Sequence, residues 1–152
     1  MTSAALSIDV STNTVSRVRD FANCTVAGHL TRLIVDARLF RPTLTTSILT
    51  EGIGDEDVRG RTVLDLGCGV GPIAIGLALA GAHHVYATDI MPEACTIAAR
   101  NARLNGVARQ ITFLSGNLFQ PVEGLKFDII VDDVSGVAED VARLSSWFPP
   151  GV

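Results

Sequence analysis

Cysteine is scarce in this sequence, and long apolar runs are missing. Cys24, Cys68 and Cys95 are odd in number and widely spaced, which suggests neither a disulfide framework nor a zinc site. We therefore expect a reducing, cytoplasmic environment. The longest apolar run, over 72–82, is shorter than the roughly 20 residues that cross a bilayer. No charged-then-apolar leader opens the sequence, so neither a membrane span nor a secretory signal is expected.

Basic residues are also in short supply. Lys and Arg number 12 against 16 Asp and Glu, which gives a formal net charge of −4 at pH 7. This balance argues against a broad electrostatic contact with nucleic acid. Hydrophobic residues make up 47% and charged residues 18% of the chain, so a folded globular protein is expected rather than a disordered one.

Strands and helices alternate from residue 61 onward. The apolar runs predict strands over 62–66, 84–88, 111–114 and 127–131. Helices are predicted over 72–80, 92–104 and 137–144, the first two opened by proline. This alternation is typical of a parallel α/β sheet with right-handed crossovers.

Residues 1–60, which precede the alternating strands and helices, have a less regular apolar pattern. Residues 43–51 predict a short helix, and the irregular apolar pattern over 15–39 predicts one or two more. We therefore divide the chain into an N-terminal helical segment, 1–39, and an α/β domain, 40–152.

Three glycines at alternate positions follow the first predicted strand. They are Gly67, Gly69 and Gly71, and the next strand ends in the carboxylate of Asp89. Glycine lets a backbone pass close to a ligand or take positive φ. A carboxylate at the neighbouring strand tip is placed to accept hydrogen bonds from a ribose. The pattern predicts a site for a nucleoside cofactor, although a tight turn alone would also use these glycines.

The spacing of the glycines in this loop distinguishes between two kinds of cofactor. A dinucleotide fingerprint, G-x-G-x-x-G, rests a pyrophosphate on the helix N-terminus. Here the third glycine comes one residue early, and Pro72 occupies the sixth position. Asp65, two residues before the first glycine, would repel a pyrophosphate but suits a cation such as the amino group of a methionyl moiety. S-adenosylmethionine, with its sulfonium and ammonium charges, is favoured over NAD.

The segments VLDLGCGVG (63–71) and YATDI (86–90) resemble the first and second motifs of class I S-adenosylmethionine-dependent methyltransferases. The resemblance implies a Rossmann-like, doubly wound parallel sheet. It implies that Asp89 binds the ribose hydroxyls and that Ile90 packs on the adenine. The cofactor-binding residues that it implies in these segments are Asp65, Gly67, Cys68, Gly69, Gly71, Asp89 and Ile90. An Asp at a strand end is also a common helix cap, and the sequence leaves that alternative open.

Residues 92–106 and 116–121, with Phe40-Arg41-Pro42, are similar to the branch of the family that methylates nitrogen. This branch acts on protein glutamine, ribosomal protein or ribosomal RNA guanine. In it an Asp or Asn after the third strand meets the adenine amino group. The resemblance assigns this contact to Asn117, with Leu118 beside it, although the Asn is equally a turn residue.

The branch's Asn-Pro-Pro-aromatic motif is missing after the fourth predicted strand. Asp133 stands at the Asn position, next to Asp132. Either carboxylate would orient a substrate amine or hydroxyl, or act as a general base; the alternative is a strand-end loop without a catalytic role. Catechol-type O-methyltransferases hold a metal at this position, but one carboxylate is no magnesium site, so no metal is expected. We choose Asp133 as the catalytic candidate.

The predicted sheet also lacks the last three strands of the family. An incomplete sheet leaves an edge strand that invites pairing, so a homodimer is one expectation. Two functions follow. The first is an S-adenosylmethionine-dependent methyltransferase with an unidentified protein, RNA or small-molecule acceptor. The alternative is a non-catalytic methyltransferase-like binding module, or a half-domain that needs a partner. An NAD-dependent oxidoreductase is disfavoured by Pro72 and Asp65.

Overall fold

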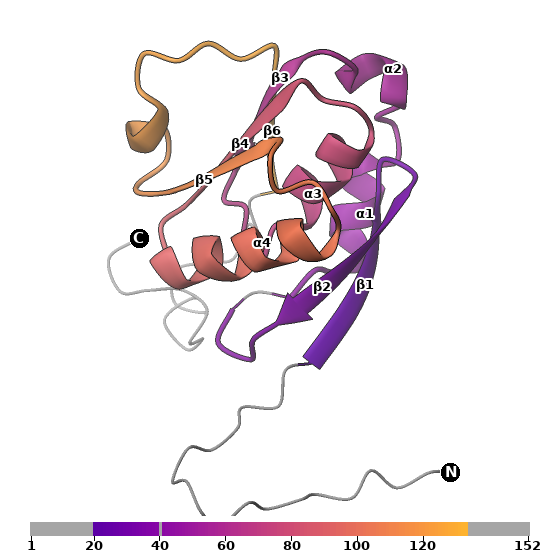
Figure 1. Cartoon of the computed structure of the whole chain (residues 1–152), viewed down its shortest axis with the longest axis vertical. Helices are drawn as coiled ribbons and strands as arrows, with labels where there is room; N and C mark the ends of the chain where they lie inside the picture. Colours follow the sequence, from indigo (N-terminus) through magenta and orange to yellow (C-terminus); the bar gives the residue numbers. More distant parts are fainter. Residues whose placement is uncertain (1–19, 40, 134–152) are drawn as a thin grey trace, which may run out of the picture.

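The computed structural model describes residues 20–39 and 41–133, which form three layers (Figure 1). A parallel sheet is the first layer, two helices pack on one of its faces, and a β-hairpin covers the helices. Residues 1–19, Phe40 and the predicted helix over 137–144 lie outside the described residues.

The sheet confirms the predicted parallel α/β fold. Its strands are β3 (Thr62–Leu66), β4 (His84–Asp89), β5 (Ile111–Ser115) and β6 (Ile129–Asp132), in the order β5-β4-β3-β6. All neighbouring pairs are parallel. The helices between them are α3 (Pro72–Leu79) and α4 (Pro92–Leu104). A short 3₁₀ turn, η1 (Gln120–Val122), lies between β5 and β6.

The strand order creates a switch point. The chain advances from β3 to β4 to β5, and right-handed crossovers place α3 and α4 on the same face. After β5 the chain returns to the opposite edge of β3 to form β6. In open α/β sheets, ligands bind outside the carboxyl ends of the strands at such a reversal. The fold therefore places the candidate site at the carboxyl ends of β3, β4 and β6.

The N-terminal segment corrects one prediction. Residues 20–35 were expected to be helical and instead form an antiparallel hairpin of β1 (Asp20–Val26) and β2 (His29–Val35). Ala27 and Gly28 make the turn, with φ of 47° and 77°, as two-residue hairpin turns require. Burial alternates along the strands, but Phe21 and Leu30 are exposed, which obscures the two-residue period in the sequence. The division of the chain at residue 40 stays a prediction.

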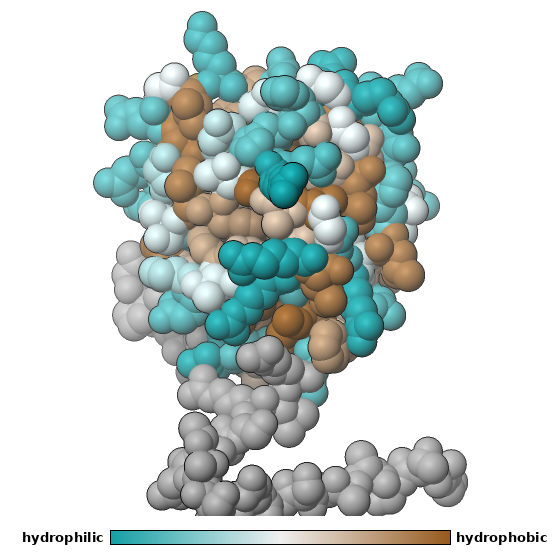
Figure 2. Space-filling view, in the orientation of Figure 1, coloured by the Kyte–Doolittle hydropathy of each residue, from teal (hydrophilic) through white to brown (hydrophobic). Residues whose placement is uncertain are grey.

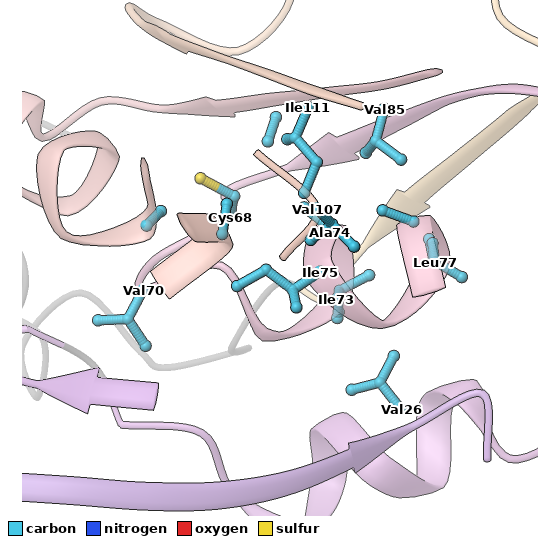
Figure 3. Close-up of a cluster of buried hydrophobic side chains, with 14 of the residues drawn as sticks. Val26, Cys68, Val70, Ile73, Ala74, Ile75, Leu77, Val85, Val107 and Ile111 are labelled. Atoms are coloured by element: carbon cyan, nitrogen blue, oxygen red, sulfur yellow. The ribbon is translucent and has the colours of Figure 1, made fainter. Parts of the chain in front are cut away.

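The hairpin shares one hydrophobic core with the helices (Figure 3). Val26 of β1 faces α3, where Ile73 and Leu77 are also buried. Helix α3 is almost entirely apolar because it lies between the sheet and the hairpin. A smaller cluster on the other face of the sheet contains Leu64, Leu66, Val122, Tyr86, Leu114 and Phe127.

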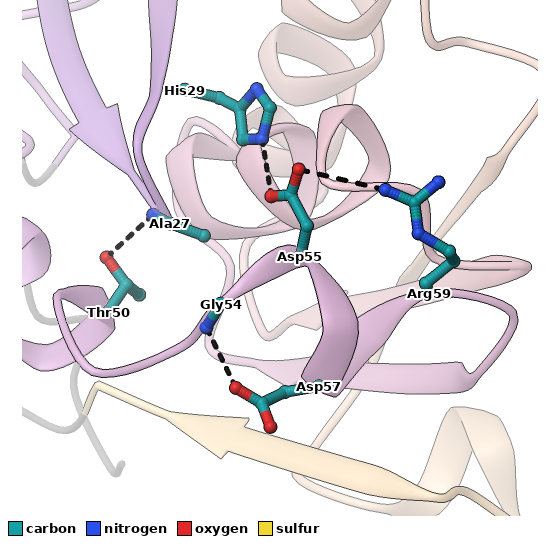
Figure 4. Close-up of polar contacts among 7 residues, drawn as sticks. All are labelled: Ala27, His29, Thr50, Gly54, Asp55, Asp57 and Arg59. Carbon is teal, nitrogen blue, oxygen red and sulfur yellow. Dashed lines mark hydrogen bonds and ion pairs between the residues drawn. The ribbon is translucent and has the colours of Figure 1, made fainter.

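Two short helices hold the hairpin turn (Figure 4). They are α1 (Leu44–Thr50), which confirms the predicted helix over 43–51, and α2 (Asp55–Val58). The Thr50 hydroxyl accepts a hydrogen bond from the Ala27 amide at 3.4 Å, and Asp55 Oδ1 lies 2.8 Å from His29 Nε2.

Figure 2 shows hydrophilic residues interspersed with hydrophobic ones on the viewed face. Among the described helices, none is long and apolar enough to cross a membrane.

Gly76 of α3 offers a test of the hairpin packing. A Cβ at this position would overlap the side chain of Val26 and lie 3.1 Å from its carbonyl oxygen. Helix propensity alone predicts that Gly76→Ala stabilises the protein by about 1 kcal/mol. We expect the opposite, a loss of about 1–3 kcal/mol in the free energy of unfolding, because the hairpin must move off the helix. Urea unfolding measures this difference.

Gly52→Ala is the matched control, since a Cβ there meets nothing within 4 Å. We expect it to leave stability unchanged or slightly raised. A Gly76→Ala protein as stable as the control would contradict the close packing of β1 on α3.

Candidate functional site

The glycine loop joins β3 to α3 at the switch point. Gly67, Gly69 and Gly71 all have positive φ, of 75°, 53° and 87°. A Cβ on Gly71 would lie 3.0 Å from the Cβ of Ala98 in α4, whereas a Cβ on Gly67 or Gly69 would meet nothing within 4 Å. Gly71 is therefore required for packing, while the first two glycines leave open space that a ligand could approach closely.

The end of β4 holds the loop in place. The Thr88 carbonyl accepts hydrogen bonds from the amides of Gly67, at 2.9 Å, and Cys68, at 2.8 Å. The Gly71 amide donates to the Cys68 carbonyl at 2.8 Å, which closes the turn. The backbone of the loop is thus fixed largely by a neighbouring strand.

Asp89 lies directly beside the loop, as predicted. Its Oδ2 accepts a hydrogen bond from the Gly69 amide at 2.8 Å, and its Oδ1 accepts one from the Met91 amide at 2.9 Å. The residue is half-buried. Each carboxylate oxygen can accept two hydrogen bonds, so both oxygens keep capacity for a ligand. The hydrogen bond to Met91, the N-cap residue of α4, is a local turn contact, and the helix has no side-chain cap.

Asp65 lies beneath the loop rather than on its surface. It is only 1% exposed, and its Oδ2 accepts a hydrogen bond from the Ala74 amide in the first turn of α3, at 3.0 Å. Burial raises the pKa of Asp65 to about 7, and the hydrogen bond from Ala74 opposes this shift. The nearby carboxylates of Asp89, Asp133 and Asp132 contribute to this rise. Near neutral pH the carboxyl is therefore present in both protonation states.

These four carboxylates gather at the ends of three strands. None of them forms an ion pair with a Lys or Arg of the described residues, where the acidic partners are Asp20, Asp36 and Asp55. Negative charge gathered at one edge of the sheet attracts a cationic ligand. Within the described ranges, no group of three His, Cys, Asp or Glu residues is suited to a metal ion.

Apolar side chains flank Asp89 on the solvent side. Ile90 is 39% exposed and Leu118 is 62% exposed, although both are large and apolar. Asp89 pairs with Ser115, and the Gly116 amide donates to the Asp89 carbonyl at 3.0 Å, so the ends of β4 and β5 lie side by side. Asn117, also exposed, follows at this edge. The structure brings these three predicted cofactor-binding residues to the same end of the sheet.

Cys68 is the predicted site residue that turns inward. Its side chain packs in the core (Figure 3), and the residue is 4% exposed. A hydrogen bond with Cys95 and burial raise the pKa of the Cys68 thiol well above its usual range. Cys68 is therefore an uncharged thiol at neutral pH and is not activated as a nucleophile.

Asp133 follows β6 and is half-buried. The hydroxyl of Thr46 in α1 donates a hydrogen bond to its Oδ2 at 3.0 Å, and Thr46 is only 3% exposed. Asp132, the last residue of β6, is exposed. Sequence reasoning missed Thr46, because 87 positions separate the two partners and no motif marks the threonine.

Comparison with known proteins assigns the chain to a family. The family model described as ribosomal protein L11 methyltransferase (PrmA) matches residues 43–145, which is more than half of the chain. The ribosomal protein L11 methyltransferase of Aliivibrio salmonicida is 41% identical over 103 residues, covering 67% of this chain and 33% of that protein. The release factor glutamine methyltransferase of Moorella thermoacetica is 39% identical over 97 residues, covering 59% of this chain and 33% of that protein.

One solved structure agrees with this assignment, and a second shares the fold. The ribosomal protein L11 methylase of Lactobacillus delbrueckii matches with a TM-score of 0.58 and 39% identity, covering 72% of this chain and 55% of that one. The Thermus thermophilus 16S rRNA N2 G1207 methyltransferase (RsmC), in complex with AdoMet and guanosine, shares the fold, with a TM-score of 0.67 and 23% identity. This match covers 79% of this chain and 34% of the RsmC chain.

The chain spans about a third of the length of the curated relatives it matches. The matched part nevertheless includes the glycine loop, Asp89 and Asp133. The resemblance to class I methyltransferases is confirmed, and the chain belongs to the ribosomal protein L11 methyltransferase (PrmA) family.

Proposed function

We propose that this chain binds S-adenosylmethionine and takes part in methyl transfer to a nitrogen of a protein, RNA or small-molecule acceptor. The observation that carries the proposal is the hydrogen bond between Asp89 and the Gly69 amide, which joins a strand-end carboxylate to a glycine loop at the switch point of the sheet. Relatives named as methyltransferases of ribosomal protein L11 and of release factor glutamine support it.

The residues present fit the cofactor. The open space at Gly67 and Gly69 would receive its methionyl end against the loop backbone. Asp89 would bind the ribose hydroxyls, and exposed Ile90, Asn117 and Leu118 would contact the adenine. In this proposal Asp65 acts from beneath the loop, as a negative charge that favours the ammonium and sulfonium of the ligand. Cys68 supports the loop by packing.

Methyl transfer demands little acid–base chemistry of the protein. S-adenosylmethionine supplies a methyl group that its sulfonium already activates, so the chain's main task is to align the acceptor nitrogen. Asp133 is our candidate for that alignment. An ionised carboxylate only accepts hydrogen bonds, so it suits an acceptor that presents N–H groups. Thr46 would hold this carboxylate in one orientation.

The alternative function is a binding module or half-domain that needs a partner. The observation in its favour is an exposed strand edge in the described sheet. Strand β6 is one of the two edge strands of the described sheet, and its Ile130 is 52% exposed. A homodimer paired along β6 is one form of this alternative. A sedimentation mass equal to one chain at micromolar concentration would exclude this homodimer.

We also propose a cytoplasmic location, since all three cysteines are free.

Asp89 gives the most direct test of the cofactor site. We expect Asp89→Ala to weaken binding of S-adenosylmethionine and of its demethylated product on the order of 100-fold, because charge-assisted hydrogen bonds to the ribose are lost. Isothermal titration calorimetry measures both ligands. Asp57→Ala is the control, since Asp57 also accepts a backbone hydrogen bond, from Gly54 at 2.9 Å, but lies outside the loop. Equal affinity in both variants would refute the site.

Asp65 predicts a pH dependence of stability. Its pKa is raised from 3.8 to about 7 on folding, so between these values the folded state holds a proton that the unfolded chain has released. Stability therefore falls as pH rises, by up to roughly 1.4 kcal/mol for each pH unit. Asp65→Asn cannot ionise, so we expect it to gain stability relative to wild type from pH 5 to pH 8. Urea unfolding across this range measures the difference; parallel curves would contradict the prediction.

Asp133 is tested by separating binding from transfer. We expect Asp133→Asn to keep the wild-type affinity for S-adenosylmethionine but to lower methyl transfer by roughly tenfold or more. Thr46→Val removes the hydrogen bond to Asp133 with little change in shape and should cause a smaller loss. The assay follows tritium from labelled S-adenosylmethionine into ribosomal protein L11, a release factor or ribosomal RNA. An unchanged transfer rate, or a loss of cofactor affinity instead, would exclude the alignment role.

A further inference from the structure

Asn101 of α4 and Asn105, the C-cap residue of that helix, pair with the outer edge of the hairpin. The Asn101 side chain accepts a hydrogen bond from the Ile34 amide, at 2.7 Å, and donates one to the Ile34 carbonyl, at 3.0 Å. One turn later, Asn105 makes the same two bonds with Arg32, at 3.0 and 2.8 Å. Residues four apart lie on the same face of a helix, and residues two apart lie on the same edge of a strand. The spacing of Asn101 and Asn105 therefore matches that of Ile34 and Arg32. The side-chain amides thus take the place of a neighbouring strand along β2.

Asn101 differs from Asn105 in one contact. Its amide nitrogen also donates to the carbonyl of Val70, at 2.9 Å, inside the glycine loop. Asn105 instead donates to the Asn101 carbonyl, at 2.8 Å, and makes no hydrogen bond to the loop within the described part of the chain. Asn101 is fully buried, whereas the bonds of Asn105 to Arg32 are exposed. A single buried side chain therefore connects the hairpin with the loop.

The position of this contact matters for the loop. Val70 lies between Gly69 and Gly71, two residues with positive φ and no side chain to fix their conformation. Asp89 holds the amide of Gly69 from the β4 side, and Asn101 holds the carbonyl of Val70 from the α4 side. Inside a protein, leaving such a carbonyl unpaired is costly, so the hydrogen bond from the Asn101 amide stabilises this shape of the loop.

We propose that Asn101 is a positioning residue that couples the β1–β2 hairpin to the glycine loop, and through the loop to cofactor binding. The proposal rests on the proposed function, because the loop is taken as the cofactor site. Ile34 fixes both ends of the Asn101 amide, and that amide in turn fixes the Val70 carbonyl. Order in the hairpin and occupancy of the loop therefore stabilise each other, as linkage between two sites requires.

The first experiment compares the two asparagines. We measure the affinity of the full chain for S-adenosylhomocysteine by calorimetry in wild type, Asn101→Ala and Asn105→Ala. Each variant removes one pair of hydrogen bonds to β2, but only Asn101→Ala removes the bond to the loop. We expect roughly a tenfold weaker affinity for Asn101→Ala and less than about a twofold change for Asn105→Ala. Equal losses in the two variants would overturn the coupling.

The second experiment needs no variant, which protects the test if Asn101→Ala fails to fold. Hydrogen exchange is measured on wild type with and without saturating S-adenosylhomocysteine. We expect the ligand to slow exchange of the Ile34 amide, which donates to Asn101, more than that of the Arg32 amide, which donates to Asn105. If Asn101 only stabilised the fold, the ligand would slow exchange of the Ile34 and Arg32 amides to the same extent.

The outcomes distinguish the two proposals. Binding by the wild type with no difference between Ile34 and Arg32 overturns the coupling and leaves the cofactor site intact. No binding by folded wild-type protein overturns both. Slower exchange at Ile34 together with the selective effect of Asn101→Ala supports the coupling.

Discussion

The glycine loop between β3 and α3 cannot hold its own shape, and the candidate site depends on the groups that hold it from outside. Three positive-φ glycines give the backbone its close turn but supply no side chains to fix it. The Thr88 carbonyl, the Asp89 carboxylate and the Asn101 amide fix it instead, from β4 and α4. The conformation of the loop therefore depends on the assembled layers as well as on its own glycines.

The same arrangement explains the charge at the site. Parallel strands bring their carboxyl ends to one edge of the sheet, so Asp65, Asp89 and Asp133 meet there although they are far apart in the chain. Of these three, only Asp65 is deeply buried. Its burial raises the pKa of its carboxyl to about 7, so the carboxyl is partly protonated near neutral pH. Asp89 and Asp133 keep partial contact with solvent and hydrogen-bond to a backbone amide and a threonine, respectively.

Much of this could be predicted from local sequence. The strand at 62–66, the helix at 92–104 and the loop carry strong periodic and glycine signals, and each was predicted at its observed place. The hairpin was not, because exposed Phe21 and Leu30 interrupt its two-residue period. Contacts such as Thr46 with Asp133 and Asn101 with Val70 join segments that only tertiary packing brings together. Their residues carry no sequence signal of that pairing.

The layer order also bears on how the chain is made. The hairpin is synthesised before every other described element, yet it is the outermost layer and packs on helices that end near residue 104. Until α3 has left the ribosome, the apolar side chain of Val26 lacks the helix on which it packs. The backbone edge of β2 at Arg32 and Ile34 also lacks its asparagine partners until α4 follows. An unpaired strand edge of this kind is where nascent chains associate wrongly, so α4 completes the hairpin and also ends its exposure to such pairing.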